Sequence, residues 1–222
     1  MTRTCKNQPC GARFEVPGDD PLLERFVRFC PECSRKEHEA VRLAEQDRMK
    51  RERESKWNAI CPPGYRDTEI GKLPDAAKAA EVLAWNYGPT GLLLHGATRR
   101  GKSRCAWLLA RKMFDQGKSV RALDALAGFE YATAFASAAG AHAWINDYCR
   151  CGLLFFDDVF KARLTDSFEA AVFAIAEYRQ SHKLPVLASL NDTGETLMAR
   201  MSADRGDALV ARLREMCRVI QF

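Results

Sequence analysis

The sequence predicts an α/β fold in which a parallel sheet is flanked by helices and a small cysteine-rich module precedes it. Three observations predict this fold. Short apolar runs alternate with helical patterns from residue 57 onward, as in parallel sheets connected by helices. A glycine-rich segment joins one of these runs to a helix, and four of the nine cysteines lie early in the chain. At 222 residues and 47% hydrophobic content, the chain can form one such core and an extension, which we divide at residues 1–34, 35–56 and 57–222.

The early cysteines form two pairs, Cys5-x4-Cys10 and Cys30-x2-Cys33. Each pair can present two thiolates to one tetrahedral Zn²⁺, and four thiolates close the site, as in a structural zinc centre. Free or disulfide-bonded thiols are the alternative, which the odd number of cysteines and the lack of a signal segment disfavour. His38 is a substitute ligand, expected to face solvent. The other cysteines are expected to be buried as small apolar residues: Cys61, Cys105, Cys149, Cys151 and Cys217.

Residues 34–56 are dense in acidic and basic residues and contain few apolar ones. Mixed charge at helical spacing favours an exposed helical connector over a nucleic-acid grip. The segment from Cys61 to Tyr65 contains two prolines and a glycine, which are expected to end this helix and mark the start of the α/β domain.

Residues 96–103 have the pattern G-x4-G-K-S, between the apolar run 92–94 and a helical pattern that begins near Arg104. In such a loop backbone N–H groups surround phosphates, Lys102 reaches the β and γ phosphates, and the Ser103 hydroxyl ligates Mg²⁺. The positive end of the next helix faces the same anion. A turn that matches by chance is the alternative, and the strand-before, helix-after context disfavours it. The expected nucleotide-binding residues are Gly96, Ala97, Thr98, Arg99, Arg100, Gly101, Lys102, Ser103 and Arg104.

A second element is expected to hold the metal and to position water for attack on the γ phosphate. Residues 153–158 predict a buried strand with two carboxylates at its carboxyl end, where ligands bind in parallel sheets. Asp157 is expected to bind Mg²⁺ through water, and Asp158 to act as the base or water-positioning group. A buried strand with a solvated acidic end is the alternative; the spacing of about fifty residues from the phosphate loop favours the metal site.

The remaining elements follow from the same periodicities. Helices are expected at 76–85, 103–116, 124–136, 143–148, 168–180 and 207–214, and strands at 92–95, 119–123, 185–190 and 218–221. Asp166 or Ser167 is the expected cap of the 168–180 helix. Parallel strands carry their ligands at one edge, so Asn191 is expected beside the phosphate loop, where its amide orients the attacking water. A strand-end turn is the alternative role for Asn191.

The net charge and the lengths of the apolar stretches limit the partners and the location expected for the protein. A net charge of +5 permits nucleic-acid contact without requiring it. No stretch approaches the eighteen or more apolar residues of a membrane span, and the start has no signal-peptide core. A cytoplasmic protein without membrane contact is therefore expected.

With these motifs in place, residues 57–222 resemble the AAA+ ATPases of the DnaC/IstB group, the replicative helicase loaders and transposition helper ATPases. The resemblance makes 96–103 the Walker A loop, 153–158 the Walker B strand and Asn191 the sensor 1 residue. It also implies an AAA+ sheet without the helical lid of larger relatives. Tyr65 is implied to lie beside the adenine.

The same resemblance places the arginine finger on Arg212, with Arg214 as the alternative. In this group a neighbouring subunit supplies the finger, so self-association into an ATP-dependent oligomer is implied. Two features depart from the group. Asp158 replaces a more common Glu, which shortens its reach to water and is expected to slow turnover, and Arg99 and Arg100 replace smaller residues.

The implied activity is hydrolysis of ATP to ADP and phosphate, slow and dependent on assembly, with ATP, Mg²⁺ and Zn²⁺ as cofactors. The leading hypothesis is a helicase loader for DNA replication that docks on a replicative helicase through the zinc module and helps place it on single-stranded DNA. An IstB-type transposition helper, a weakly hydrolysing adaptor and a zinc DNA-binding protein with a secondary ATPase are the alternatives. The clustered cysteines disfavour the helper, and Lys102, Asp157, Asn191 and Arg212 together disfavour the adaptor.

DNA contact has several candidate positions. Lys161, Arg163 and Lys183 are basic, and residues 129–144 are rich in aromatic side chains, which single strands use for stacking. The near-helical spacing of Phe129, Tyr131, Phe135 and Trp144 instead predicts that these four rings belong to the core.

Overall fold

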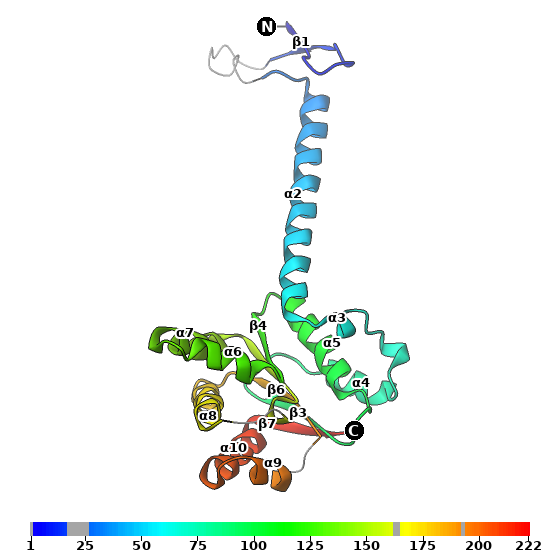
Figure 1. Ribbon diagram of the computed structural model, residues 1–222. Helices are drawn as coiled ribbons and strands as arrows, with labels where there is room; N and C mark the ends of the chain where they lie inside the picture. Colours follow the sequence, from blue (N-terminus) through cyan, green and yellow to red (C-terminus); the bar gives the residue numbers. More distant parts are fainter. Residues whose placement is uncertain (1, 17–26, 162–164, 192–193) are drawn as a thin grey trace. The chain divides into compact units, whose positions relative to one another are not determined.

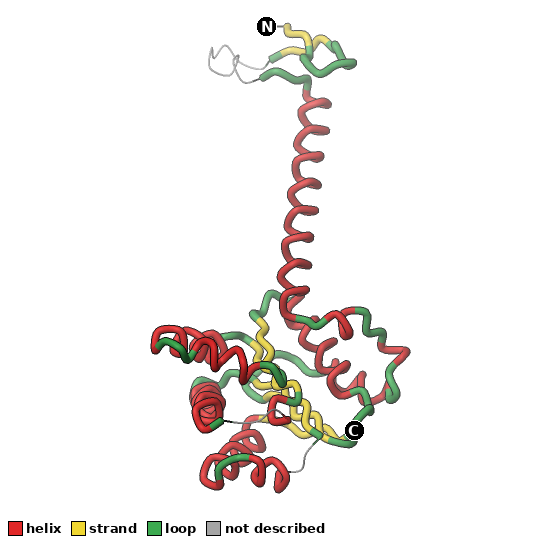
Figure 2. Tube along the Cα trace, viewed as in Figure 1, coloured by secondary structure: helices red, strands yellow, loops and turns green. Residues whose placement is uncertain are grey.

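The structure is a computed structural model that describes residues 2–16, 27–161, 165–191 and 194–222 (Figures 1 and 2). Arg163, a predicted DNA contact, lies outside the described residues. Chain contacts divide the protein into two compact units, Met1–Lys56 and Trp57–Phe222. None of the described helices has the length and hydropathy of a membrane span.

The first unit contains a small antiparallel hairpin and most of a long helix. Strand β1 (Thr2–Thr4) pairs with β2 (Arg13–Glu15), and neither strand was predicted. Helix α2 (Pro31–Ile60) includes the predicted segment 34–56 and extends beyond it at both ends. Val41, Leu43 and Met49 are exposed along this helix, and pairs such as Lys36 with Glu32 (2.7 Å) lie on its surface. The helix ends before Cys61, where the two prolines were expected to end it.

The second unit is built on a five-stranded parallel sheet with the order β4-β5-β6-β3-β7 (Figure 2). Its strands are β3 (Gly91–His95), β4 (Val120–Leu123), β5 (Leu153–Asp157), β6 (Val186–Leu190) and β7 (Cys217–Gln221). All five predicted strands are present. The order places β3 between β6 and β7, so that the phosphate loop after β3 lies beside the carboxyl end of β6, and β5 comes next.

Helices cover both faces of the sheet. They are α3 (Pro63–Arg66), α4 (Ala76–Leu83), α5 (Lys102–Asp115), α6 (Ala127–Ala134), α7 (Ala138–Arg150), α8 (Asp166–Ser181), α9 (Gly194–Arg200) and α10 (Ala203–Met216), with 3-10 turns η1 (Ile70–Lys72) and η2 (Val159–Lys161). Helices α4 and α5 pack with Leu92 and Leu94 in one apolar cluster, and α7, α8 and α10 form the other. Side chains that alternate along β3 therefore serve the two faces in turn.

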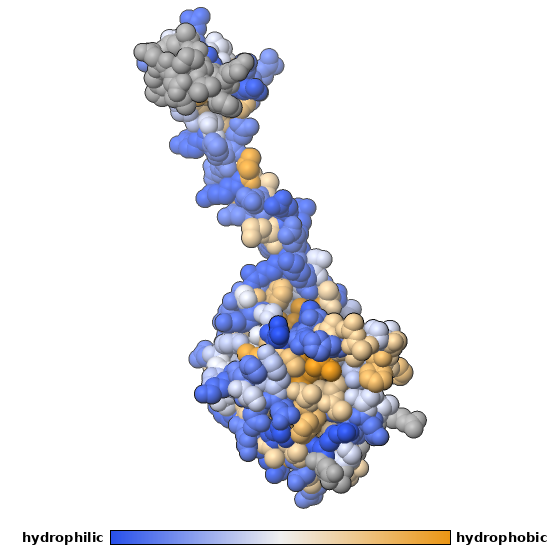
Figure 3. All heavy atoms as spheres, turned by 90° about the vertical axis from the view of Figure 1, so that its left-hand side faces the viewer, coloured by the Kyte–Doolittle hydropathy of each residue, from blue (hydrophilic) through white to orange (hydrophobic). Residues whose placement is uncertain are grey.

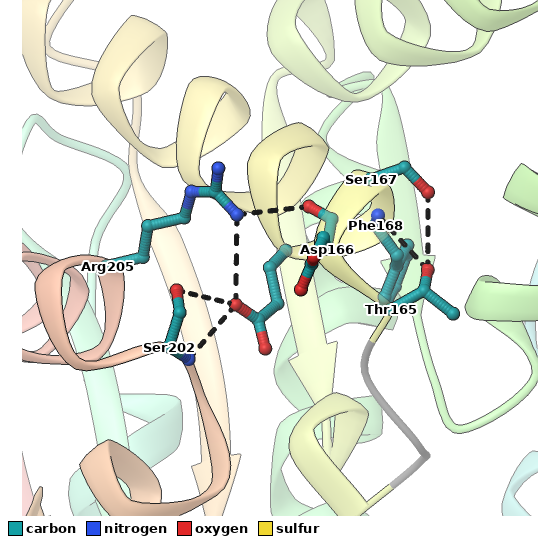
Figure 4. Close-up of polar contacts among 7 residues, drawn as sticks. Thr165, Asp166, Ser167, Phe168, Ser202 and Arg205 are labelled. Carbon is teal, nitrogen blue, oxygen red and sulfur yellow. Dashed lines mark hydrogen bonds and ion pairs between the residues drawn. The ribbon is translucent and has the colours of Figure 1, made fainter.

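Several helix boundaries differ from the predictions. The predicted helix 124–136 is shorter, and α7 begins at Ala138, because the Ser137 side chain accepts a hydrogen bond from the Gly140 N–H and caps it. The cap of α8 is Thr165 and not Asp166 or Ser167: its Oγ1 accepts from the Phe168 N–H at 3.3 Å (Figure 4). Helix α9 was not predicted.

A buried carboxylate joins α8 to the start of α10. Glu169 is 4% exposed and accepts hydrogen bonds from the Ser202 backbone N–H (3.1 Å) and hydroxyl (2.9 Å). Arg205 lies 3.9 Å from the same carboxylate and donates to the Asp166 carbonyl at 3.1 Å (Figure 4). These contacts fix the orientation of α10, the helix that carries Arg212, against α8.

The aromatic segment 129–144 is only partly core. Tyr131 is buried and packs with Trp144 (ring centroids 5.0 Å apart), as predicted. Phe129 and Phe135 were predicted to be core and are instead 75% and 57% exposed. The prediction is wrong for these two rings because α6 is short and the chain turns at Ser137, so α6 presents one side to solvent. Figure 3 shows apolar atoms exposed on the side of this unit where α6 and α7 lie in Figure 1.

Candidate nucleotide site and cysteine cluster

The four early cysteines meet in one cluster. The Sγ atoms of Cys5, Cys10, Cys30 and Cys33 all lie within 4.8 Å of one another, and those of Cys10 and Cys30 are 3.8 Å apart. A zinc ion with Zn–S bonds of about 2.3 Å separates its sulfur ligands by about 3.8 Å. The sulfur positions therefore fit a tetrahedral metal. His38, the substitute ligand, is exposed on α2 and is not part of the group.

Hydrogen bonds prepare one thiol of this cluster for ligation. The backbone N–H of Cys30 donates to Cys5 Sγ at 3.3 Å. This contact favours the thiolate and lowers the pKa of Cys5 to about 7. Asn7 Nδ2 donates to Cys33 Sγ at 3.4 Å and favours its thiolate, but the neighbouring thiols and burial raise the pKa of Cys33 to about 12. Because a thiolate is the form that binds zinc, the donor to Cys5 favours metal binding near neutral pH at that one thiol.

The phosphate loop connects β3 to α5 as expected. Gly96 has φ +145° and Gly101 has φ +92°, the left-handed region that favours glycine. A Cβ at Gly96 would also lie 2.2 Å from the Phe222 carbonyl oxygen. Any other residue at either position would distort the loop. The last glycine precedes the first turn of α5, so the helix N-terminus is directed at the loop.

Lys102 lies inside this loop. Its side chain is 5% exposed, and Nζ donates to the carbonyl oxygens of Gly96 (2.8 Å) and Ala97 (2.7 Å). A third donation, at 2.6 Å, reaches Oδ1 of Asn191 at the end of β6. The ammonium group is therefore held at the centre of the loop and connected to the neighbouring strand.

Asp157 is placed directly against the serine of the loop. Its Oδ1 accepts from the Ser103 hydroxyl at 2.7 Å and from Ser189 at 2.8 Å, and its Oδ2 accepts from the indole N–H of Trp107 at 3.1 Å. Burial raises the pKa of Asp157, and these donors oppose the shift. A hydroxyl beside a carboxylate at the carboxyl end of a strand is a donor set that suits Mg²⁺.

Asp158 and Asn191 form the other side of the site. Asp158 has φ +52°, a conformation that costs energy for a non-glycine residue and is concentrated at functional sites. Its carboxylate accepts from Asn191 Nδ2 at 2.9 and 3.1 Å, and its N–H donates to the Ser189 carbonyl. Asn191 thus connects Lys102 to Asp158, as the convergence of strand ends predicted.

A cavity of about 430 Å³ opens over these groups. It is lined by residues 98–104 of the loop and α5 together with Tyr65, Lys72, Pro74, Asp158 and Asn191. The Tyr65 ring is half-buried, stacks on Trp107 (6.0 Å between centroids, 22°) and has the Arg104 guanidinium 5.7 Å from its centroid. Tyr65 therefore gives the cavity an aromatic wall. Arg99 and Arg100 are exposed at its rim.

Searches against protein-family models and against curated proteins find no match. Solved structures match most of the chain. The DnaC helicase loader aligns with a TM-score of 0.55 at 17% identity over 72% of this chain and 99% of that one. DnaI aligns at 0.57 and 15%, over 72% and 90%. The replication initiator DnaA bound to AMPPCP and single-stranded DNA aligns at 0.55 and 15%, over 72% and 50%, so the chain spans half the length of that protein.

The core domain has an AAA+ fold. The loop 96–103, Asp157 and Asn191 all lie at the carboxyl edge of its parallel sheet. The chain is thus similar in structure to helicase loaders and to DnaA, at identities that show the fold alone.

The predicted arginine finger of this AAA+ domain lies apart from the network around Lys102. The Arg212 guanidinium is 3.5 Å from the Glu177 carboxylate and 4.3 Å from the Phe173 ring centroid, both on α8, and Nη1 donates to the Ala208 carbonyl. Its side chain is partly accessible. Arg214 is exposed, and its guanidinium lies beside Gly194.

Two residues of the site were missed by sequence reasoning. Ser189 pairs in register with Asp157, and the signal for it was a single serine within an otherwise apolar strand. Trp107 follows Ser103 by four residues on α5, one helical turn away. Its indole N–H had no signal in the sequence, because an apolar helix face predicts a tryptophan only as core.

Proposed function

We propose that this protein is an ATP-dependent helicase loader of DNA replication. The observation that carries the proposal is the connected network from Lys102 through Asn191 to Asp158, with Ser103 against Asp157, on a fold shared with nearly the whole of the DnaC helicase loader. We assign ATP as the nucleotide and Mg²⁺ as its metal.

The proposed chemistry is hydrolysis of ATP to ADP and phosphate. The loop N–H groups and Lys102 would hold the phosphates, and Ser103 and Asp157 would hold Mg²⁺, which neutralises charge between the β and γ phosphates. Asp158 accepts from Asn191 and would position the attacking water. The short Asp158 side chain is anchored by this contact, which fits slow turnover and use of the nucleotide as a switch.

The arginine finger is proposed to act on a neighbouring subunit. Arg212 contacts α8 of its own chain through Glu177 and Phe173, and it is on the edge of α10 that remains partly accessible. Exchange of the Glu177 contact for a γ phosphate would pair the same guanidinium with a stronger anion. An isolated monomer is therefore expected to hydrolyse ATP slowly, and an ATP-dependent oligomer faster.

The zinc module is proposed as the arm that docks on a hexameric replicative helicase. Four thiols whose Sγ atoms lie within 4.8 Å of one another can fill all four positions of a tetrahedral zinc ion. No position is then open for catalysis, so the proposed role of the metal is to stabilise the fold of the module. The exposed helix α2 connects it to the ATPase domain. The exposed rings Phe129 and Phe135 are the proposed stacking positions for single-stranded DNA.

The test is a binding experiment with the host's replicative helicase. Size-exclusion chromatography with light scattering is run on the mixture with ATP and with ADP, for wild type, Lys102→Ala and Cys30→Ser. Cys61→Ser is the matched control, because Cys61 is buried but lies outside the cysteine cluster. We expect a complex that requires Cys30 and not Cys61, and whose stoichiometry changes between ATP and ADP.

Other outcomes assign other functions. If no complex forms under any condition, the loader proposal fails, and transposase with double-stranded DNA is the next partner to test. A stable complex that is identical with ATP, with ADP and with Lys102→Ala would contradict nucleotide control and would leave an adaptor.

A further inference from the structure

Trp107 lies between the two halves of the proposed nucleotide site. It is on α5, 2% exposed, and one helical turn after Ser103. On one side it stacks on Tyr65, which lines the cavity, and on the other its indole N–H reaches Asp157. Neither the packing of a core nor the phosphate loop requires a hydrogen-bond donor at this position.

Neighbouring rings fix the orientation of the indole. Trp57 and Phe155 pack against it edge-on, with centroids 6.0 and 5.1 Å away and interplanar angles of 76° and 78°. With Tyr65 on its face, the ring is enclosed by three aromatic groups and cannot turn without displacing one of them. The indole N–H is a donor only, so its one polar function is to hold Oδ2 of Asp157.

The two carboxylate oxygens of Asp157 therefore have different hydrogen-bond partners. Oδ2 is held by Trp107 at 3.1 Å, while Oδ1 is directed at the hydroxyls of Ser103 and Ser189. Fixing one oxygen fixes the plane of the carboxylate. Oδ1 is then the oxygen that faces Ser103, the second residue expected to contact Mg²⁺.

We propose that Trp107 is a positioning residue for magnesium at this site, acting through Asp157. The inference rests on the proposed function, because it requires that the site binds a nucleotide with Mg²⁺. Loss of the indole N–H frees the carboxylate to rotate, so Mg²⁺ is bound more weakly while contacts to the phosphates by the loop and Lys102 are kept.

The test compares Trp107→Phe with Trp85→Phe. Trp85 is also buried, in the same apolar cluster, and its indole N–H donates to the Thr90 carbonyl at 2.9 Å. Each variant keeps an aromatic ring and loses one N–H, but only one of them touches Asp157. Equilibrium dialysis measures ATP affinity in EDTA and then the Mg²⁺ concentration that gives half of the Mg²⁺-dependent gain in binding.

We expect Trp107→Phe to raise this half-saturating Mg²⁺ concentration by about tenfold, the scale for losing one hydrogen bond to a charged group, and to leave ATP affinity in EDTA within about twofold of wild type. Trp85→Phe should change neither quantity. Equal Mg²⁺ dependence in the two variants would overturn the inference, as would a loss that is the same with and without Mg²⁺, since that result indicates packing alone. Wild type that binds no ATP would instead refute the proposed function itself.

A measurement on the wild type avoids reliance on a folded Trp107 variant. The chain has four tryptophans, so ¹⁵N-tryptophan labelling gives four indole N–H resonances, assigned with Phe variants of the other three. Adding Mg²⁺ to the ATP-bound protein should shift the Trp107 resonance and leave that of Trp85 in place. An unshifted Trp107 resonance would contradict the inference.

Discussion

Replacing Arg179 by methionine should destabilise the α/β domain strongly, although Arg179 is not part of the candidate nucleotide site. The residue is fully buried on α8. Its guanidinium donates to the carbonyls of Tyr148, Cys149 and Cys151 (3.0, 3.2 and 2.9 Å), and to those of Gly152 and Pro185 (3.3 and 2.7 Å). These carbonyls belong to the end of α7 and to the chain just before β5 and β6.

The size of the effect follows from these contacts. Methionine fills the stem's volume but removes this donor from five carbonyl groups. The Gly152 carbonyl still accepts from the Tyr87 hydroxyl at 3.1 Å, and each buried carbonyl left unsatisfied costs about 1–3 kcal/mol. Burial of the guanidinium costs free energy in the wild type and lowers the pKa of Arg179, so removing the charge offsets part of this loss in the variant. The guanidinium also lies at the negative end of α7, and the variant loses this favourable interaction. We expect a net loss of about 3–5 kcal/mol, which lowers the melting temperature of a domain of this size by about 10 °C.

The assay is thermal unfolding followed by circular dichroism, with Arg150→Met as the control. Arg150 is exposed in the last turn of α7, so its replacement should cost less than about 1 kcal/mol. Arg179→Lys should fall between the two, because an ammonium group offers fewer donors in a different geometry. A melting temperature for Arg179→Met within 3 °C of that of Arg150→Met would show that the buried Arg179 contacts add little to the stability of the domain.

Three further predictions concern metal, thiols and assembly. Removing zinc from the zinc-loaded protein with a chelator should change its circular-dichroism spectrum, because the proposed cysteine site loses its metal, and should leave the melting of the α/β domain unchanged; a shared transition would contradict this. Burial raises the pKa of Cys105 to about 11 and of Cys217 to about 12, so below these values both thiols stay protonated, and iodoacetamide at pH 7.5 should leave them unlabelled in mass spectra of the native protein. Arg212→Ala should abolish the rise of the ATPase rate with protein concentration and leave ATP binding unchanged. Glu177→Ala removes the contact that holds Arg212 on α8, so this variant should keep or increase that rise. Loss of the rise in both variants would argue against an arginine finger that acts on a neighbouring subunit.

The sequence alone predicted the elements that depend on residues close to one another in the chain. The phosphate loop, the apolar strand before Asp157 and the cysteine pairs each need particular residues at fixed spacing, so the pattern alone predicts them. The position of Asn191 also followed, because a parallel sheet brings strand ends to one edge.

The parts that could not be predicted depend on tertiary contacts. The Trp107 indole is a hydrogen-bond donor to Asp157 only because β5 lies beside α5, and nothing in the helical pattern distinguishes it from a core residue. Phe129 and Phe135 were placed in the core because their spacing is near-helical, but the short length of α6 leaves them exposed. The buried contacts of Glu169 and Arg179 involve loops far away in sequence, which composition cannot pair.

Lys102 and the residues around it are proposed to bind ATP with Mg²⁺. Isothermal titration of ATP in Mg²⁺ into wild type, Lys102→Ala and Lys183→Ala measures this binding. Lys183 is exposed and precedes β6, at the opposite end of the strand from Asn191. Wild type should bind one ATP per chain, and the affinity for ATP should be lowered on the order of a hundredfold in Lys102→Ala and unchanged in Lys183→Ala. Wild type without ATP binding, or equal affinities in all three proteins, would contradict a nucleotide site at Lys102.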